Sequence, residues 1–124
     1  MNEGLTIQQV AEATQLSEHT LRYYERIGLI HPISRADNGH RRYSPDDIGW
    51  IDFLTKLRAA GMTIQQMQAY AELQRRGDET LPERVEMLKA VRRKVEERME
   101  ELQQHLNLLT YKVEIYSEQI KQVT

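Results

Sequence analysis

Apolar positions recur at two different spacings along the chain. Up to about residue 75 they form short groups spaced three or four residues apart, each with a hydroxyl-bearing or polar turn before it. This pattern predicts several short amphipathic helices that share one core. From residue 81 onward the apolar positions repeat every seven residues, which predicts one long helix. We therefore divide the chain into a domain over residues 1–75 and a helix over residues 80–123.

Helix-start signals place the short helices. Residues 6–9 and 63–66 both read Thr-Ile-Gln-Gln, in which the threonine hydroxyl caps the helix and the second glutamine returns to the cap. Ser44 is followed by proline and two aspartates, another start signal. Ser17 begins a further helix, and Gly28 suits the left-handed conformation that ends it. The two matching threonine starts indicate two helix-turn-helix-like corners.

The segment between Gly28 and Ser44 has a different character. Pro32 disfavours a helix, and Asn38-Gly39 is a strong tight-turn pair because both residues tolerate positive φ. The segment predicts a hairpin, or wing, with strands near residues 32–35 and 41–43.

The seven-residue repeat predicts a supercoiled seam. It runs from Leu81 to Val123, and Arg92 is its only charged member. A helix of this length spans roughly 60 Å, too far to bury its apolar stripe on a small domain. We therefore expect a second copy of the chain to cover it. The residues expected in the dimer seam are Val95, Met99, Leu102, Leu106, Leu109, Val113, Tyr116 and Ile120.

Charge is concentrated rather than abundant. The formal net charge of −2 gives no overall sign of a nucleic-acid partner. Residues 19–44, however, carry five arginines against Glu25 and Asp37. Such a local patch can hold phosphates on an acidic protein, because salt limits the reach of each charge to roughly 10 Å.

Several classes of site are not expected. The chain has no cysteine, which excludes disulfides, thiolate metal sites and cysteine nucleophiles. The histidines lack metal-ligand spacing, and the Asp46-Asp47 pair fits a helix cap better than an acid–base dyad. We expect no cofactor, no metal and no enzymatic activity. The sequence has no apolar run long enough to span a membrane and no signal-peptide pattern, so we expect a soluble cytoplasmic protein. The histidines are His19, His31, His40 and His105.

The helix after Ser17 and the wing are the candidate DNA-binding elements. Arginine can pair with guanine through two hydrogen bonds, and tyrosine hydroxyls bind phosphate oxygens. The alternative is a solvated surface helix, with Tyr24 partly in the core, beside an ordinary polar turn. The residues expected to contact DNA from these two elements are Ser17, His19, Thr20, Arg22, Tyr23, Arg26, Arg35, His40, Arg41, Arg42 and Tyr43.

Four stretches together resemble the MerR family of bacterial transcription regulators. They are Thr-Ile-Gln-Gln-Val-Ala at residues 6–11, residues 17–29 around Leu-Arg-Tyr-Tyr-Glu, Arg-Arg-Tyr at 41–43, and Leu-Arg-Ala-Ala-Gly-Met-Thr at 57–63. The resemblance covers about residues 4–73, and the coil behind is also typical of the family. By motif position it implies DNA contacts from the recognition helix and the wing, and a phosphate contact at Arg58.

The resemblance also implies a mechanism. Family members are homodimers joined by an antiparallel coiled coil. They bind a pseudo-palindromic operator between promoter elements with an over-long spacer. An effector lets the dimer distort this DNA so that RNA polymerase engages both elements. The fold class implied is mainly α, a winged helix-turn-helix domain followed by a long coiled-coil helix.

The chain departs from the family where sensing is concerned. It looks most similar to the small aldehyde- or thiol-stress-responsive branch, yet Thr55 stands near the position where that branch often has cysteine. Metal and thiol sensing through cysteine are therefore excluded, and we expect no separate drug-binding domain. The effector stays unknown, and we place a hypothetical pocket near Trp50, Tyr70 and Tyr111.

Two other functions remain open. A coiled-coil interaction protein would show no salt-dependent affinity for DNA. A DNA-architectural accessory factor would bind DNA without responding to an effector.

Overall fold

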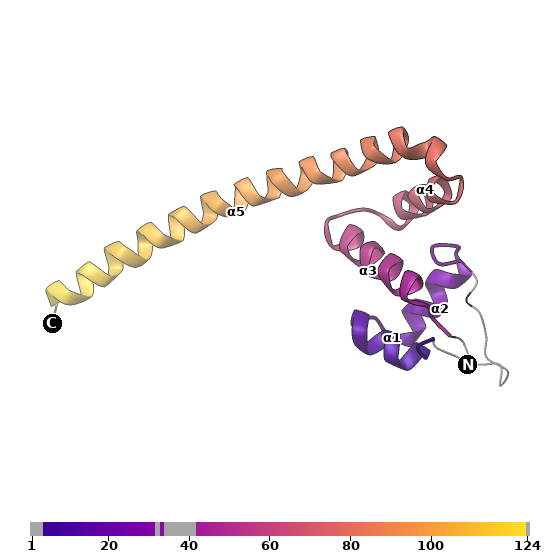
Figure 1. The fold of residues 1–124 in the computed structure, drawn as a ribbon. Coiled ribbons are helices and arrows are strands. Elements are labelled where there is room, and N and C mark those ends of the chain that lie inside the picture. The colour runs from indigo at the N-terminus through magenta and orange to yellow at the C-terminus, as the bar shows by residue number, and fades with distance from the viewer. Residues whose placement is uncertain (1–3, 32, 34–41, 124) are drawn as a thin grey trace.

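A computed structural model describes residues 4–31, 33 and 42–123 of the chain. Four short helices gather into a compact body, and the last helix leaves it as a long arm (Figure 1). The elements are α1 (Ile7–Thr14), α2 (Glu18–Arg26), α3 (Pro45–Ala59), α4 (Ile64–Arg75), the 3-10 turn η1 (Asp78–Thr80) and α5 (Leu81–Val123).

The predicted helix starts of the body are confirmed. The Thr6 hydroxyl accepts a hydrogen bond from the Gln9 amide at 3.2 Å, and the Gln9 side chain accepts one from the Thr6 amide at 2.8 Å. The same reciprocal pair of hydrogen bonds caps the start of α3 at Ser44 and the start of α4 at Thr63. Ser17 caps α2 by accepting from the amide three residues later. These local bonds satisfy amides that the first helical turn leaves without partners.

Gly28 ends α2 as predicted. Its φ of +85° permits a closing turn in which the Leu29 amide donates to the Tyr24 carbonyl at 2.9 Å. Gly61, with φ of +112°, closes α3 through an equivalent pair of bonds. Both glycines occupy a left-handed position that other residues adopt only with strain.

One core unites the body. Val10 of α1, Leu21 of α2, Ile51 and Leu54 of α3, and Met67 of α4 are all fully buried in a common cluster. Since every body helix contributes to this cluster, the position of α2 is fixed by the other three.

The predicted wing falls mostly outside the described residues, including positions 32, 34–35 and 41. Its described end, Tyr43, pairs with Leu5 in an isolated antiparallel bridge, with N–O distances of 2.9 and 2.8 Å. Within the described ranges this bridge is the only β pairing. The N-terminal segment therefore borders the base of the wing segment.

Helix α5 begins on the body and then leaves it. Met87, Leu88 and Val91 are partly buried against the core, whereas the later turns are exposed. Forty-three residues give a helix of about 65 Å. Thr80 lies just before this helix, and its hydroxyl donates to the Leu73 carbonyl at 2.6 Å. None of the described helices is both long and apolar enough to cross a membrane.

Candidate nucleic-acid interface

Helix α2 divides into a buried and an exposed face. Leu21 is fully buried and Tyr24 is 7 % exposed, which confirms that Tyr24 belongs to the core. Positions spaced by three, four and seven residues share one face of a helix. The face opposite the core presents His19, Arg22, Tyr23 and Arg26, of which only Tyr23 is partly buried.

The two arginines of this face have replaceable partners. Arg22 pairs with Glu18 at 3.2 Å, and both side chains remain more than a third exposed. The guanidinium of Arg26 lies 5.3 Å from the centre of the Tyr23 ring. Exposed ion pairs contribute at most about 1 kcal/mol, so the Arg22 guanidinium can exchange Glu18 for a nucleic acid at little cost.

Ser17 and Thr20 occupy the first turn of α2. The Ser17 hydroxyl accepts from the Thr20 amide at 3.0 Å and donates to the Thr20 hydroxyl at 2.9 Å. Both side chains therefore serve the helix start, and their contact with DNA stays a prediction.

Three successive carbonyls just after α2 are held by side chains of α3 and α4. Trp50 Nε1 donates to Leu29 at 2.7 Å, Gln68 Nε2 donates to Ile27 at 3.1 Å, and Arg75 donates to Gly28. These bonds join positions 21 to 47 residues apart, so no local sequence pattern predicts them. They hold the end of α2 firmly against the body.

The wing residues Arg35, His40 and Arg41 lie outside the described residues. Arg42 is partly buried, and Tyr43 is fully buried in the core cluster. The expectation that the Tyr43 side chain faces DNA therefore needs correction. An aromatic ring next to the Leu5 bridge gains more from burial than from exposure, and it supports the base of the wing from inside.

Arg58 lies far from Ser44, at the other end of α3. It is exposed, and its guanidinium donates to the Met62 carbonyl at 3.2 Å. Fourteen residues separate it from Ser44, about 21 Å along the helix. Any contact that Arg58 makes with DNA would therefore involve a different phosphate from one near Ser44.

The hypothetical effector pocket is only partly assembled. Trp50, Phe53 and Tyr70 form a cluster with ring centres 5.8 to 6.1 Å apart, beside a hollow of 180 Å³ that Trp50 lines. Tyr111 lies 20 residues beyond Val91, about 30 Å further along α5. Placing Tyr111 with the other aromatics was therefore wrong for a single chain, because α5 points away from the body (Figure 1).

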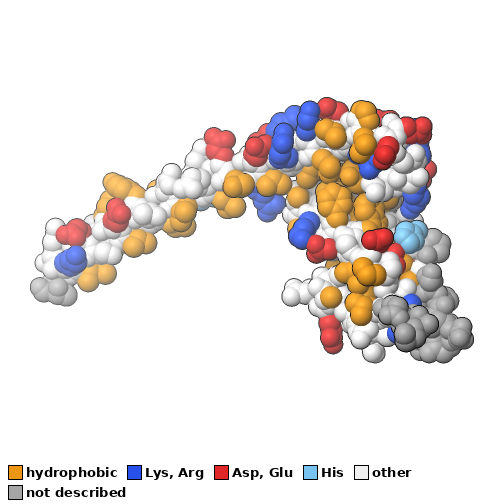
Figure 2. All heavy atoms as spheres, viewed as in Figure 1, with side chains coloured by type: hydrophobic (Ala, Val, Ile, Leu, Met, Phe, Trp, Pro, Cys, Tyr) orange, Lys and Arg blue, Asp and Glu red, His pale blue; other side chains and the backbone are white. Residues whose placement is uncertain are grey.

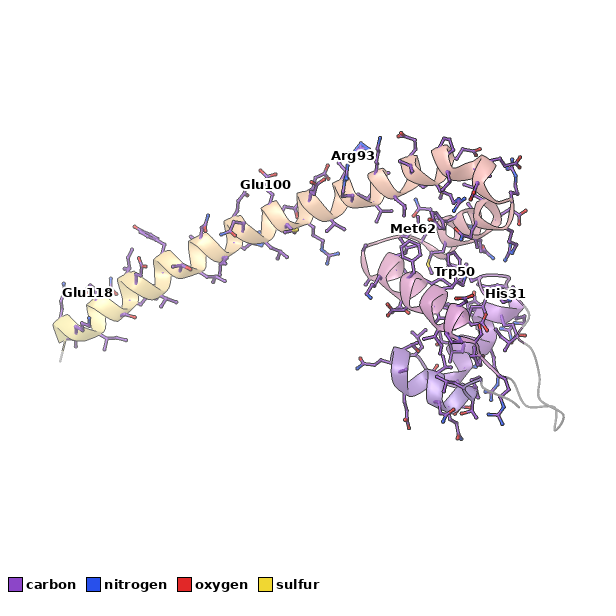
Figure 3. All side chains as sticks on the ribbon, in the orientation of Figure 1. His31, Trp50, Met62, Arg93, Glu100 and Glu118 are labelled. Carbon is purple, nitrogen blue, oxygen red and sulfur yellow. The ribbon has the colours of Figure 1, made fainter. Side chains whose placement is uncertain are left out.

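The acidic pair at the start of α3 serves as a cap. Asp47 accepts from the Ser44 amide at 2.8 Å and lies 3.1 Å from His31, which Figure 3 shows beside the start of α3. The described residues contain no group of three side chains placed to bind a metal.

Comparisons with known proteins agree with this geometry. The family model described as "MerR HTH family regulatory protein" matches residues 5–74, and the one described as "MerR, DNA binding" matches residues 48–110. The HTH-type transcriptional regulator AdhR of Bacillus subtilis is 44 % identical over 84 residues, which cover 68 % of this chain and 60 % of AdhR.

Two solved structures share the whole architecture. A MerR family transcriptional regulator from Listeria monocytogenes superposes with a TM-score of 0.82 at 39 % identity, covering 91 % of this chain and 86 % of that one. HiNmlR, a MerR family regulator lacking the sensor domain and bound to promoter DNA, also reaches 0.82, at 31 % identity and with 93 % and 91 % coverage. All three relatives are named as transcriptional regulators or MerR family regulators. The chain belongs to the MerR family of helix-turn-helix transcriptional regulators.

Proposed function

We propose that the chain works as a cytoplasmic homodimer that binds a pseudo-palindromic promoter operator and distorts the spacer DNA to control RNA polymerase. The observation that carries this proposal is the exposed face of α2, where arginine and tyrosine side chains stand opposite a buried face. A helix of this kind fits the major groove of DNA, which is about 12 Å wide.

Each side chain of the α2 face has a chemical role in this arrangement. Arg22 reads a guanine edge with two hydrogen bonds, while Tyr23 and Arg26 hold neighbouring phosphates. His19 lies near the start of the helix, where the backbone amides also attract phosphate. Arg42, at the base of the wing, adds a phosphate contact outside the groove.

The outer part of α5 supports the homodimer. Its seam residues from Met99 to Ile120 are 53 to 65 % exposed, and Figure 2 shows apolar side chains spaced along the arm. Contiguous apolar surface of this kind marks an interface. A seven-residue repeat drifts by about 20° per heptad around a straight helix, so two such helices coil around each other to keep their seams in contact.

Apolar residues outside the seam favour antiparallel pairing. Leu108 and Tyr111 are exposed and lie three heptads after Met87 and Ala90, on the same side of α5. Met87 and Ala90 line an apolar groove of 120 Å³ between α5 and the α3–α4 corner. In an antiparallel pair, this side of the arm comes beside the body of the other copy. In a parallel pair, Leu108 and Tyr111 would stay in water.

Control of RNA polymerase follows from the geometry of a dimer with two rigid bodies. Bending or untwisting a promoter spacer costs a few kcal/mol, which contacts at two half-sites can offset. An effector that binds the two dimer conformations differently would shift the balance between them.

Selection of bound duplexes from randomised DNA tests the DNA-binding part of the proposal. Purified full-length protein at moderate salt should enrich an inverted repeat. Weak, salt-sensitive retention without a repeat would instead favour an architectural factor. Absence of any salt-dependent binding would favour an interaction protein.

Engineered cysteines test the antiparallel pairing in this cysteine-free chain. An antiparallel register that pairs Val85 with Val123 of the partner puts the dimer axis near residue 104 and brings Val95 beside Val113 of the partner. The double variant Val95→Cys with Val113→Cys should therefore form disulfide-linked dimers. The single variant Val95→Cys should not, because its two thiols would lie about 27 Å apart along the axis. Efficient cross-linking of the single variant would instead show parallel pairing.

A further inference from the structure

The joint between the body and α5 contains one buried arginine. Arg84 is 8 % exposed, in the first turn of the arm. Its Nε donates to the Thr80 hydroxyl at 3.0 Å, and its two terminal nitrogens donate to the Gln74 side chain at 2.7 Å and the Gly77 carbonyl at 2.9 Å. One guanidinium thus binds the end of α4, the turn after it, the 3-10 segment and α5.

Thr80 completes this joint. It is fully buried, and its hydroxyl donates to the Leu73 carbonyl of α4 while accepting from Arg84. Gly77 turns the chain with a φ of +86°, a conformation that favours glycine. The direction in which α5 leaves the body is therefore determined by a closed set of hydrogen bonds.

All the partners of Arg84 are neutral. Among the described residues, no carboxylate lies within ion-pair distance of its guanidinium. Burying a charge without an opposite charge is costly, and apolar residues of similar volume often give equal or greater stability. What a planar guanidinium provides here, and an apolar side chain cannot, is a set of directed bonds in three directions. Its contribution is therefore geometric.

We propose that Arg84 is a positioning residue that sets the half-site spacing the dimer accepts on DNA. This inference rests on the proposed homodimer. The body turns about this joint when the bonds of Arg84 change, so the shift of α2 is set by its distance from Arg84. A rotation of roughly 10° would move a point about 20 Å from the joint by about 3–4 Å, which corresponds to roughly one base pair, since DNA rises about 3.4 Å per base pair.

Three variants remove different parts of the joint. Arg84→Lys keeps the charge but loses the planar fork, and Arg84→Met keeps the apolar volume alone. Gln74→Ala removes a single partner and leaves the guanidinium in place. Arg93→Gln is the matched control, because Arg93 lies on the outer side of the arm, away from the body (Figure 3).

Binding to a spacing series measures the effect on DNA. The selected inverted repeat is rebuilt with its centre lengthened or shortened one base pair at a time, and a single half-site serves as reference. The unaltered protein and Arg93→Gln should show one sharp optimum. Arg84→Lys and Arg84→Met should bind the site of optimal spacing about tenfold more weakly than the unaltered protein. Their affinities for sites one base pair longer or shorter should lie within about threefold of their affinity for the optimal site. Their affinity for the single half-site should be unchanged. A sharp optimum at the same spacing in the Arg84 variants would overturn the proposal.

A measurement without DNA separates this inference from the proposed function. A spin label on Glu12→Cys, exposed on α1, reports the distance between the two bodies of a dimer. The distribution should be narrow in the otherwise unaltered chain and broader or displaced with Arg84→Lys or Gln74→Ala. Identical distributions would overturn the role of Arg84, even where the proteins bind DNA. Loss of any preferred spacing in the unaltered protein would instead count against the proposed operator.

Discussion

The body and the arm follow the same rule of apolar periodicity but reach opposite states. In the body, Leu21 and Leu54 are fully buried by neighbouring helices. In the arm, Leu102 and Leu106 are more than half exposed, although α5 is as regular a helix as any other. The difference shows that an amphipathic helix is complete only when something covers its stripe. The body covers its own helices, whereas a second copy covers the arm in the proposed homodimer.

A charge in the arm should have the largest effect. Leu106→Glu would place a carboxylate from each copy in the centre of the seam, where burial of an unpaired charge costs several kcal/mol. We expect a monomer at micromolar concentration and loss of operator binding, measured by sedimentation and by DNA titration. Gln104→Glu, on the outer side of the same turn, should remain a dimer. A dimeric Leu106→Glu protein would contradict the proposed seam.

A cavity in the body should lower the free energy of unfolding, and this loss should not depend on protein concentration. Leu21→Ala removes a fully buried side chain and should lower the free energy of unfolding by about 2–5 kcal/mol. Chemical denaturation of the protein, followed by the fluorescence of Trp50 in the body, measures this change. An unaltered midpoint in Leu21→Ala would mean that α2 is not packed as described.

Changes on the DNA-facing side of the body should affect binding rather than folding. Arg22→Ala should reduce affinity for the best site by about 1–3 kcal/mol and relax the base preference at one position of each half-site. The loss of Glu18 pairing should leave thermal stability almost unchanged, because that ion pair is exposed. Arg93→Ala is the control, and unchanged sequence preference in Arg22→Ala would reject the proposed groove contact.

The smallest effect is expected at the wing base. Arg42→Ala should weaken binding to all sequences similarly and lower the slope of log affinity against log salt by about one. Titrations of a specific and a random duplex at several salt concentrations measure both quantities. A change confined to the specific duplex would show that Arg42 reads bases.

The comparison also concerns the border between the two proposed domains. We propose residues 1–75 as the DNA-binding domain and 80–123 as the dimerisation helix. Arg84, however, is bonded to Gln74 across that boundary. The two parts are therefore joined rigidly at their border, even though the body buries its apolar residues and the arm leaves most of its own exposed.

Local chemistry explains which features could be predicted from the sequence. The caps at Thr6, Ser44 and Thr63 and the closing glycine Gly28 depend on neighbours within five residues, so their patterns were sufficient. The exposed face of α2 followed from helical periodicity for the same reason. The family resemblance rested on these same local motifs.

Long-range contacts explain what the sequence could not determine. Tyr43 and Arg42 look alike as wing residues, but only packing against the body shows that Tyr43 is fully buried. The bonds of Trp50 and Gln68 to the end of α2 join positions far apart in the chain.

The sequence by itself determined that this protein has a helical body, a basic exposed face on α2 and a seven-residue apolar repeat in α5, because each is encoded by spacing along one helix. Only the tertiary structure decided where α5 leaves the body and that Arg84 is buried at that joint, because burial depends on which distant segments meet.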